Sequence, residues 1–178
     1  IYICGQAGAG KTTLAKKIAD THNMDYFVSS GSNDVLDGYC QQPCIILDDI
    51  RPSALGLSDL LKLTDPHTPC SVNCELIILT SVLKIDEFYH NVFEHENEPI
   101  NQLKRRCKFY IRMDSDFIRI RQWDNLAMRY GKEKTYINDI LLPFFEDNSV
   151  EQNSTIEKVF PFLTGNEIVS QNKSKQSK

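Results

Sequence analysis

The 178-residue sequence contains no long apolar run and no internal repeat. A membrane-spanning helix needs about 20 consecutive apolar residues, so the sequence predicts no membrane segment. The apolar stretch at residues 1–4 is also too short for the core of a signal peptide. We therefore expect a soluble, intracellular protein. The chain opens directly on a predicted strand and its first residue is not methionine, which favours one domain of a longer protein.

The sequence also lacks a basic excess, because its net charge is −4. That balance alone argues against a nucleic-acid partner. The charges are unevenly spread, however, since residues 104–134 carry ten basic and four acidic side chains. An acidic body with one basic band offers opposite charges to successive subunits, or lines a path for phosphates. A solvated basic face is the plain alternative.

The six cysteines do not make a convincing metal site. Cys40 and Cys44, like Cys70 and Cys74, are separated by three residues, a spacing that suggests zinc. Cys4 and Cys44 nevertheless belong to apolar strand runs, where cysteine acts as a small hydrophobe. Thiols also stay reduced inside cells. We expect no structural metal and no disulfide framework.

What the sequence does contain is a phosphate-binding loop, Gly-Gln-Ala-Gly-Ala-Gly-Lys-Thr-Thr at residues 5–13. Phosphates must be wrapped by backbone N–H groups, and glycines let the chain curl that closely. Lys11 is suited to reach the terminal phosphates, and Thr12 to bind Mg²⁺ at the start of a helix. The flanking residues agree with a phosphate-binding loop, which joins a strand to a helix, because residues 1–4 predict a buried strand and residues 11–20 predict a helix. The predicted nucleotide-binding residues are Gly5, Gln6, Ala7, Gly8, Ala9, Gly10, Lys11, Thr12 and Thr13.

Two later apolar runs end in polar side chains. One ends in Asp48 and Asp49, and the other ends in Thr80 and Ser81. Continuous apolar runs are typical of central parallel strands, and ligands gather at the carboxyl ends of such strands. We predict that Asp48 holds Mg²⁺ through water and that Asp49 orients or deprotonates the attacking water. Thr80 or Ser81 is predicted to sense the γ-phosphate, with ordinary capping of the strand end as the alternative.

The rest of the chain reads as further helices and strands. Helices are predicted over residues 35–39, 57–63, 85–93, 100–107, 125–130 and 136–145. Strands are predicted over residues 25–28, 108–113 and 117–123, and the last presents Arg119 and Arg121 on one face. Residues 170–178 are polar and predict a disordered tail or linker.

Taken in order, these motifs resemble the Walker A, Walker B, motif C and arginine-finger elements of superfamily 3 helicases. They occupy residues 5–13, 45–49 and 76–81, followed by Arg105 and Arg106. More narrowly, residues 1–113 resemble the helicase domain of replication initiator (Rep) proteins from rolling-circle plasmids and small circular single-stranded DNA viruses.

The resemblance implies an α/β fold, that of an AAA+-like P-loop NTPase with a mostly parallel central sheet flanked by helices. We expect the ATPase core at residues 1–113, a small α/β extension packed on it at 114–169, and the tail at 170–178. The implied activity is an ATP- and Mg²⁺-dependent DNA helicase that moves along single-stranded DNA as a homo-oligomer, a hexameric ring. Catalytic roles fall to Lys11, Asp49 and Ser81, and metal binding to Thr12 and Asp48.

The resemblance also implies roles outside the nucleotide pocket. Arg105 or Arg106 would enter the neighbouring subunit's site as a finger that neutralises charge on the transferred phosphoryl group. Lys84, Arg119 and Arg121 are the predicted DNA contacts. An N-terminal nicking endonuclease domain is expected in the full-length protein, which would act in the bacterial cytoplasm or, if viral, in the host nucleus.

Two positions depart from the family pattern. Val82 stands where motif C commonly has asparagine. The DNA-contacting hairpin that these helicases place between Walker B and motif C is too long for residues 69–74. We expect residues to be missing near Cys74 and Glu75, with a reduced loop as the alternative. Competing functions are an RNA-virus helicase of the same superfamily, a small-molecule P-loop kinase and a non-hydrolysing nucleotide switch.

Overall fold

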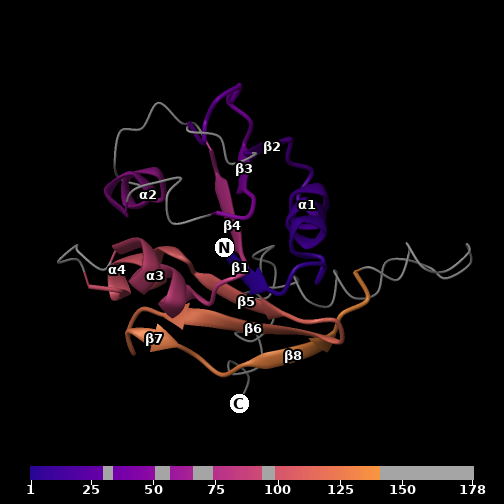
Figure 1. Ribbon diagram of the computed structural model, residues 1–178, viewed down its shortest axis with the longest axis vertical. Helices are drawn as coiled ribbons and strands as arrows, with labels where there is room; N and C mark the ends of the chain where they lie inside the picture. The colour runs from indigo at the N-terminus through magenta and orange to yellow at the C-terminus, as the bar shows by residue number, and fades with distance from the viewer. Residues whose placement is uncertain (30–33, 51–56, 66–73, 94–98, 141–178) are drawn as a thin grey trace, which may run out of the picture.

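The computed structural model describes residues 1–29, 34–50, 57–65, 74–93 and 99–140 (Figure 1). Within them, eight strands form one sheet in the order β2-β3-β4-β1-β5-β6-β7, and β8 pairs with β6. The strands are β1 (Tyr2–Gly5), β2 (Tyr26–Ser29), β3 (Cys44–Leu47), β4 (Leu76–Ser81), β5 (Phe109–Met113), β6 (Phe117–Asp124), β7 (Arg129–Tyr130) and β8 (Lys134–Ile137). The helices are α1 (Lys11–Thr21), α2 (Leu57–Leu63), α3 (Ile85–Phe93) and α4 (Asn101–Arg106). The predicted α/β fold with a mostly parallel sheet is confirmed.

Five strands, β2, β3, β4, β1 and β5, are parallel. β4 lies between β1 and β3, with Ile3 opposite Thr80 and Leu47 opposite Leu79. The carboxyl ends of β1, β3 and β4 therefore lie side by side, although these strands are about 40 residues apart in sequence. The phosphate loop, the two aspartates and motif C all follow strands at this one edge of the sheet, where parallel α/β proteins bind ligands.

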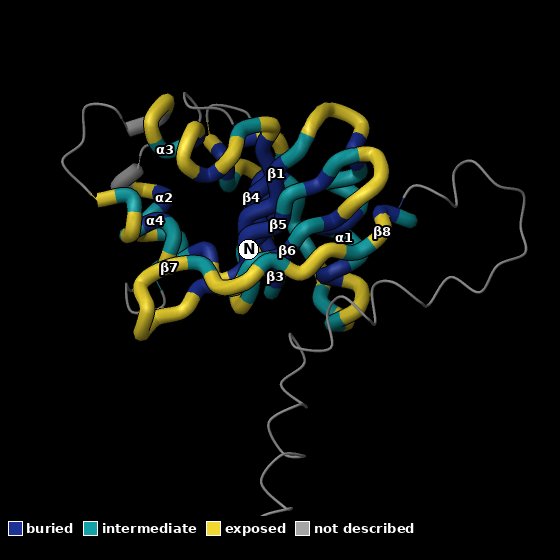
Figure 2. The backbone as a smooth tube through the Cα atoms, turned by 90° about the horizontal axis from the view of Figure 1, so that it is seen from below, coloured by how far each residue is buried: buried dark blue, intermediate teal, exposed yellow. Residues whose placement is uncertain are grey.

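Successive side chains along a strand point to opposite faces of the sheet, and both faces of the central strands are covered. Ile3 points to the α1 side, where it packs with Leu14 and Ile18. Its neighbours Tyr2 and Cys4 belong to the cluster that contains Leu60 of α2, Phe88 of α3 and Leu103 of α4. Figure 2 shows the resulting arrangement, with buried central strands between more exposed helices and turns. This double cover explains why the central strands read as continuous apolar runs.

Three helix predictions were wrong. Residues 35–38 form turns, residues 125–128 form a turn leading into β7, and residues 136–137 belong to β8. At both turns a carboxylate competes with the helical pattern: Asp34 Oδ1 accepts the Leu36 N–H, and Asp124 Oδ1 accepts the Leu126 N–H. Such local side-chain bonds favour turns over helices.

The strands after residue 113 continue the same sheet. β6 pairs antiparallel with β5, and β8 pairs antiparallel with β6. The predicted division at residues 113 and 114 stays a prediction, since residues 141–178 lie outside the described part of the chain. So do residues 66–73, which include most of the shortened loop. In the described residues, no helix is long and apolar enough to span a bilayer.

Candidate nucleotide-binding site

The phosphate loop joins β1 to α1 and has the backbone that its glycines predict. Gly8 and Gly10 have φ angles of 80° and 88°, which side-chain-bearing residues rarely adopt. Gly5 is required for a different reason: a Cβ there would lie 2.2 Å from the carbonyl oxygen of Met113. β5 therefore fixes the base of the loop. α1 begins at Lys11 without a side-chain cap, so its first N–H groups are available to an anion.

The Lys11 side chain folds back along the loop. Its ammonium donates hydrogen bonds to the carbonyl oxygens of Gly5, at 2.9 Å, and Gln6, at 3.0 Å. Lysine is a flexible point charge, and both contacts are to neutral acceptors. Charged phosphate oxygens are stronger acceptors than these carbonyls, so a bound phosphate would replace the carbonyls as partner of the ammonium.

Asp48 is the centre of a small network that joins the start of α1 to the ends of β3 and β4. Its Oδ1 accepts a hydrogen bond from Thr12 Oγ1 at 2.7 Å and another from Thr80 Oγ1 at 2.7 Å. Thr12 lies in the first turn of α1, whereas Thr80 lies near the end of β4. The carboxylate is thus oriented from both sides, next to the hydroxyl predicted to bind Mg²⁺.

Asp49 has a different environment from Asp48. It is exposed, and its φ of 47° lies in the left-handed region that few non-glycine residues adopt. Its backbone N–H donates to Thr80 Oγ1 at 2.8 Å, and the next N–H, of Ile50, donates to the Thr80 carbonyl at 2.9 Å. Motif C therefore stabilises the turn that projects the second carboxylate outward.

The two motif C hydroxyls are enclosed. Thr80 is fully buried, and its hydroxyl both donates to Asp48 and accepts from Asp49. Ser81 is 1% exposed, and its Oγ accepts the Leu83 N–H at 3.2 Å. The sensor role predicted for either residue stays a prediction. The structure assigns Thr80 a positioning contact with Asp48 that the strand-end pattern did not specify.

The residues present fit a nucleotide with Mg²⁺. The hydroxyl of Thr12 and the carboxylate of Asp48 are hard oxygen ligands, and Mg²⁺ typically uses one or two such groups together with phosphates and waters. No group of three or more His, Cys, Asp or Glu side chains within the described ranges could hold a metal by itself. Any Mg²⁺ at this edge would therefore depend on the nucleotide for its remaining ligands.

Comparison with known proteins identifies the family. Residues 1–78 match the protein family described as RNA helicase. Over 153 residues, the chain is 47% identical to a protein named "Replication protein" from Onion yellows phytoplasma (strain OY-M). That match covers 81% of this chain and 40% of the relative, so the chain spans well under two thirds of the relative's length. The chain contains a superfamily 3 helicase domain. This family implies NTPase activity, in agreement with the phosphate loop.

The two candidate finger arginines of the helicase domain differ sharply. Arg106 is 12% exposed and donates to Asp65 Oδ2 at 3.0 Å and to the Gln102 carbonyl at 3.0 Å. It ties α4 to the end of α2. Arg105 is exposed, and it has no ion-pair partner among the residues that the structure describes. The pattern of two adjacent basic residues did not separate these environments.

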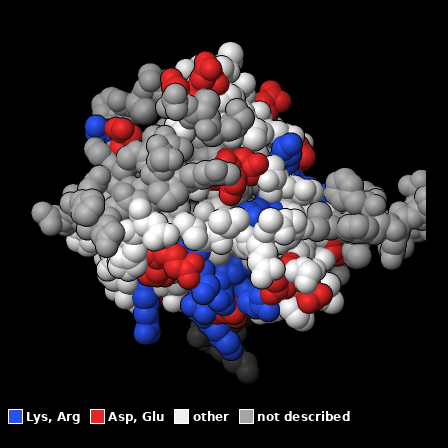
Figure 3. Space-filling model, viewed as in Figure 1, with Lys and Arg blue, Asp and Glu red and all other residues white. Residues whose placement is uncertain are grey.

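The predicted DNA contacts of the helicase domain are paired within the chain. Lys84 lies 3.5 Å from Glu87, Arg119 binds Asp114, and Arg121 binds Glu133. Figure 3 shows basic side chains gathered on one part of the surface, with acidic side chains among them. Much of the basic band of the sequence is therefore neutralised locally, and the three DNA contacts stay predictions.

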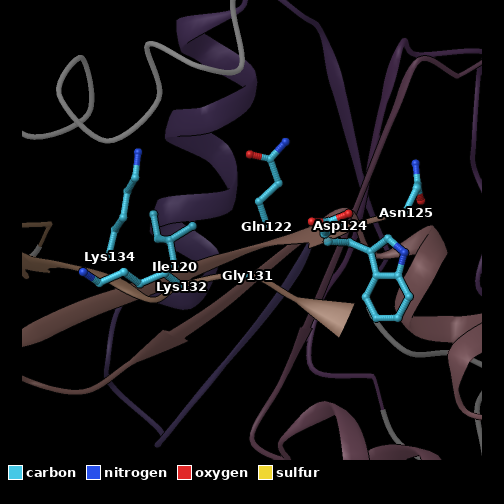
Figure 4. Close-up of a pocket in the computed structure, with 8 residues that line it drawn as sticks. Ile120, Gln122, Asp124, Asn125, Gly131, Lys132 and Lys134 are labelled. Carbon is cyan, nitrogen blue, oxygen red and sulfur yellow. The ribbon is translucent and has the colours of Figure 1, made fainter. Parts of the chain in front are cut away.

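A pocket of about 680 Å³ lies on β6 of the helicase domain, among polar side chains (Figure 4). Gln122, Asn125, Lys132 and Lys134 are among the residues that line it. Gln122 pairs with Phe109, at the start of β5, so the pocket is at the sheet edge opposite the phosphate loop. Sequence reasoning missed it, because Gly131 and Lys132 lie between β7 and β8, in a stretch that the sequence assigned to no element.

The buried cysteines of the helicase domain behave as apolar side chains. Burial raises the pKa of Cys44 to about 12 and that of Cys107 to about 11. Burial likewise raises the pKa of Cys4. These thiols are protonated at neutral pH, so they are poor nucleophiles and poor metal ligands in this fold.

Proposed function

We propose that this chain is the ATP-hydrolysing motor of a replication protein that moves along single-stranded DNA during rolling-circle replication. The observation that carries the proposal is the contact of Thr12 and Thr80 with one Asp48 carboxylate. It brings Walker A, Walker B and motif C together at one sheet edge. The relative's name, "Replication protein", and its phytoplasma source favour a bacterial plasmid and the bacterial cytoplasm.

In the proposed reaction the residues at this edge of the sheet have separate roles. The loop N–H groups and Lys11 bind the phosphates, while Thr12 and Asp48 hold Mg²⁺, which when bound neutralises charge on the phosphate oxygens. Asp49, exposed on its left-handed turn, orients the attacking water. Thr80 keeps both aspartates in place, because its hydroxyl contacts the Asp48 side chain and the Asp49 backbone.

We assign the finger to Arg105. Arg106 already fixes α4 through Asp65, whereas Arg105 is exposed and available to an adjoining subunit. A finger supplied in trans requires a head-to-tail interface, which closes into a ring; we propose a hexamer. The greater length of the relative is compatible with a nicking endonuclease domain elsewhere in the full-length protein.

A mixing experiment tests the shared site. Arg105→Ala and Lys11→Ala are each expected to be inactive, and a 1:1 mixture should recover up to about a quarter of wild-type ATPase activity, because a quarter of random interfaces join an intact loop to an intact arginine. The control mixes Arg105→Ala with the double variant Lys11→Ala/Arg105→Ala, which supplies no arginine and should stay inactive. Equal rates in both mixtures would refute the trans finger.

Stability measurements separate the two arginines. Arg106→Ala should lower the free energy of unfolding by about 1–3 kcal/mol, because it removes the charge-assisted hydrogen bond from Arg106 to Asp65. Arg105→Ala should change it by less than about 0.5 kcal/mol, as is usual for exposed positions. A larger loss for Arg105→Ala than for Arg106→Ala would reverse the assignment.

For the nucleic-acid contact we propose the pocket on β6. Lys132 is exposed and has no ion-pair partner in the described part of the chain, and amide side chains beside it can bind base edges. Lys132→Ala should reduce the slope of log K against log salt by about 0.7 for single-stranded DNA. Arg119→Ala serves as the control, since Arg119 is paired with Asp114.

Tighter binding and unwinding of RNA than of DNA would favour the RNA-helicase alternative, which the matched family's description raises.

A further inference from the structure

The side chain of Asn138 connects the phosphate loop to the C-terminal strands. Asn138 follows β8 and is 8% exposed. Its Nδ2 donates to the carbonyl oxygen of Ala9 at 3.1 Å and to that of Asp114 at 2.6 Å. Its backbone N–H donates to the Asp116 carbonyl at 2.8 Å. One asparagine therefore joins three segments that are far apart in sequence, namely the loop, the β5–β6 turn and the end of β8.

The orientation of this amide is fixed by its partners. Two carbonyl oxygens face the same side-chain atom, and only the NH₂ group of asparagine can donate to both. Its Oδ1 lies near the backbone N–H of Ile140, at 3.4 Å. Replacing the NH₂ by a second carboxylate oxygen would set a negative charge against two acceptors, while leaving the shape of the side chain almost unchanged.

The contact with Ala9 restrains the orientation of the peptide between Ala9 and Gly10. Ala9 lies between Gly8 and Gly10, which both have positive φ and little conformational restriction of their own. In a planar trans peptide the C=O and the following N–H point in opposite directions. A carbonyl held by buried Asn138 therefore turns the Gly10 N–H toward the exposed side of the loop, where phosphates would be bound.

We propose that Asn138 is a positioning residue that presets the phosphate loop for the nucleotide. This inference rests on the proposed function, because it assigns a role in ATP binding. Gly5 supports the base of the loop against Met113, and Asn138 supports its far side next to Asp114. The antiparallel strands after residue 113 are thus required for the loop's binding conformation, even though they carry none of the Walker residues.

The test compares ATP binding and turnover in the full chain for wild type, Asn138→Asp and Asn138→Ala. We expect a correctly oriented Gly10 N–H to bind phosphate equally in the ground state and the transition state, so in the variants KM for ATP should rise about 10-fold while kcat changes little. The Kd of a fluorescent ADP analogue should rise by the same factor. Asn91→Asp is the matched control, since Asn91 is exposed on α3, and it should leave KM and Kd unchanged.

The outcomes distinguish this inference from the proposed function. If wild type binds ADP and both folded variants match its Kd, the positioning role is wrong and the function stands. If wild type binds no nucleotide, the proposed function fails first. A loss of melting temperature with unchanged KM, measured well below unfolding, would identify a purely structural contact.

A measurement on wild type decides the case if neither variant folds. In the ¹⁵N NMR spectrum, the Asn138 side-chain NH₂ protons should exchange slowly with solvent, and their signal should shift when ADP binds. Fast exchange without any shift would overturn the inference.

Discussion

The parallel strands and the antiparallel strands lie in one sheet (Figure 1), and they use their polar residues differently. In the parallel part, Thr12, Asp48 and Thr80 come from separate segments and meet at one edge. At the antiparallel strands, Arg121 of β6 binds Glu133, which also binds Arg112 of the adjoining β5. The first arrangement presents polar atoms to a ligand, whereas the second neutralises charge within the chain. Part of the positive charge of residues 104–134 is therefore paired within the chain, although basic side chains still gather on one part of the surface (Figure 3).

Removing the central carboxylate should have the largest effect. Asp48→Asn keeps the size of the side chain but weakens Mg²⁺ binding, so ATPase activity should fall by at least about 100-fold. The matched control is Asp37→Asn at an exposed turn, which should retain full activity. Rates that fall equally in both variants would mean that the contacts of Asp48 with Thr12 and Thr80 give it no special role.

Substitutions at two glycines test how tightly each part of the sheet is packed. Gly5→Ala brings a Cβ to 2.2 Å from the Met113 oxygen, and we expect a loss of about 3 kcal/mol in the free energy of unfolding. Gly131→Ala should be tolerated, because the corresponding nearest atom, the Gln122 oxygen, is 3.5 Å away. Urea titrations give both values, and an unchanged midpoint for Gly5→Ala would show that β5 does not constrain the loop.

A smaller effect is expected where the antiparallel strands meet α4. The Tyr130 hydroxyl lies 2.8 Å from the Cys107 carbonyl and 3.2 Å from that of Lys104. Tyr130→Phe should therefore destabilise the protein by about 1 kcal/mol. Tyr136→Phe removes the same atom from a partly buried tyrosine for which no hydroxyl contact is found in the described residues, and should have no effect in the same thermal melts.

The smallest effect concerns the charge pairs of the antiparallel part. Burial raises the pKa of Glu133, but Arg112 and Arg121 lower it more, so its pKa lies below the usual 4.5. A lowered pKa in the folded state stabilises the protein above pH 4.5, and this stabilisation is lost as the pH falls through the folded-state value. Glu133→Gln should be less stable than wild type by up to about 1 kcal/mol near pH 7.

The pH dependence supplies the check on Glu133. The difference between wild type and Glu133→Gln should shrink as the pH is lowered from about 6 to about 3, because protonation removes the same charge in wild type. A difference that stays constant over this range would mean that the two arginines do not stabilise the carboxylate.

Sequence reasoning located the parallel part accurately. The apolar runs predicted β1, β3 and β4 within one residue, because double burial leaves few polar positions in central strands. It was wrong at residues 125–130 and at residues 136–140, the described part of the helix predicted at 136–145, where the apolar spacing suited a helix. The Asp124 turn and the pairing of Tyr136 with Ile118 decided otherwise. Strand pairing depends on distant residues and is not encoded in a local period.

The sequence by itself determined the phosphate loop and the chemical types gathered around it, since a loop that wraps phosphates needs glycines, a lysine and a hydroxyl at fixed spacing. Only the tertiary structure decided which of two adjacent arginines is held by an ion pair, that Thr80 orients Asp48, and that Asn138 holds the Ala9 carbonyl. The physical reason is that hydrogen bonds and ion pairs are short-range contacts. Partners 30 to 130 residues apart become neighbours only when strand order has been set.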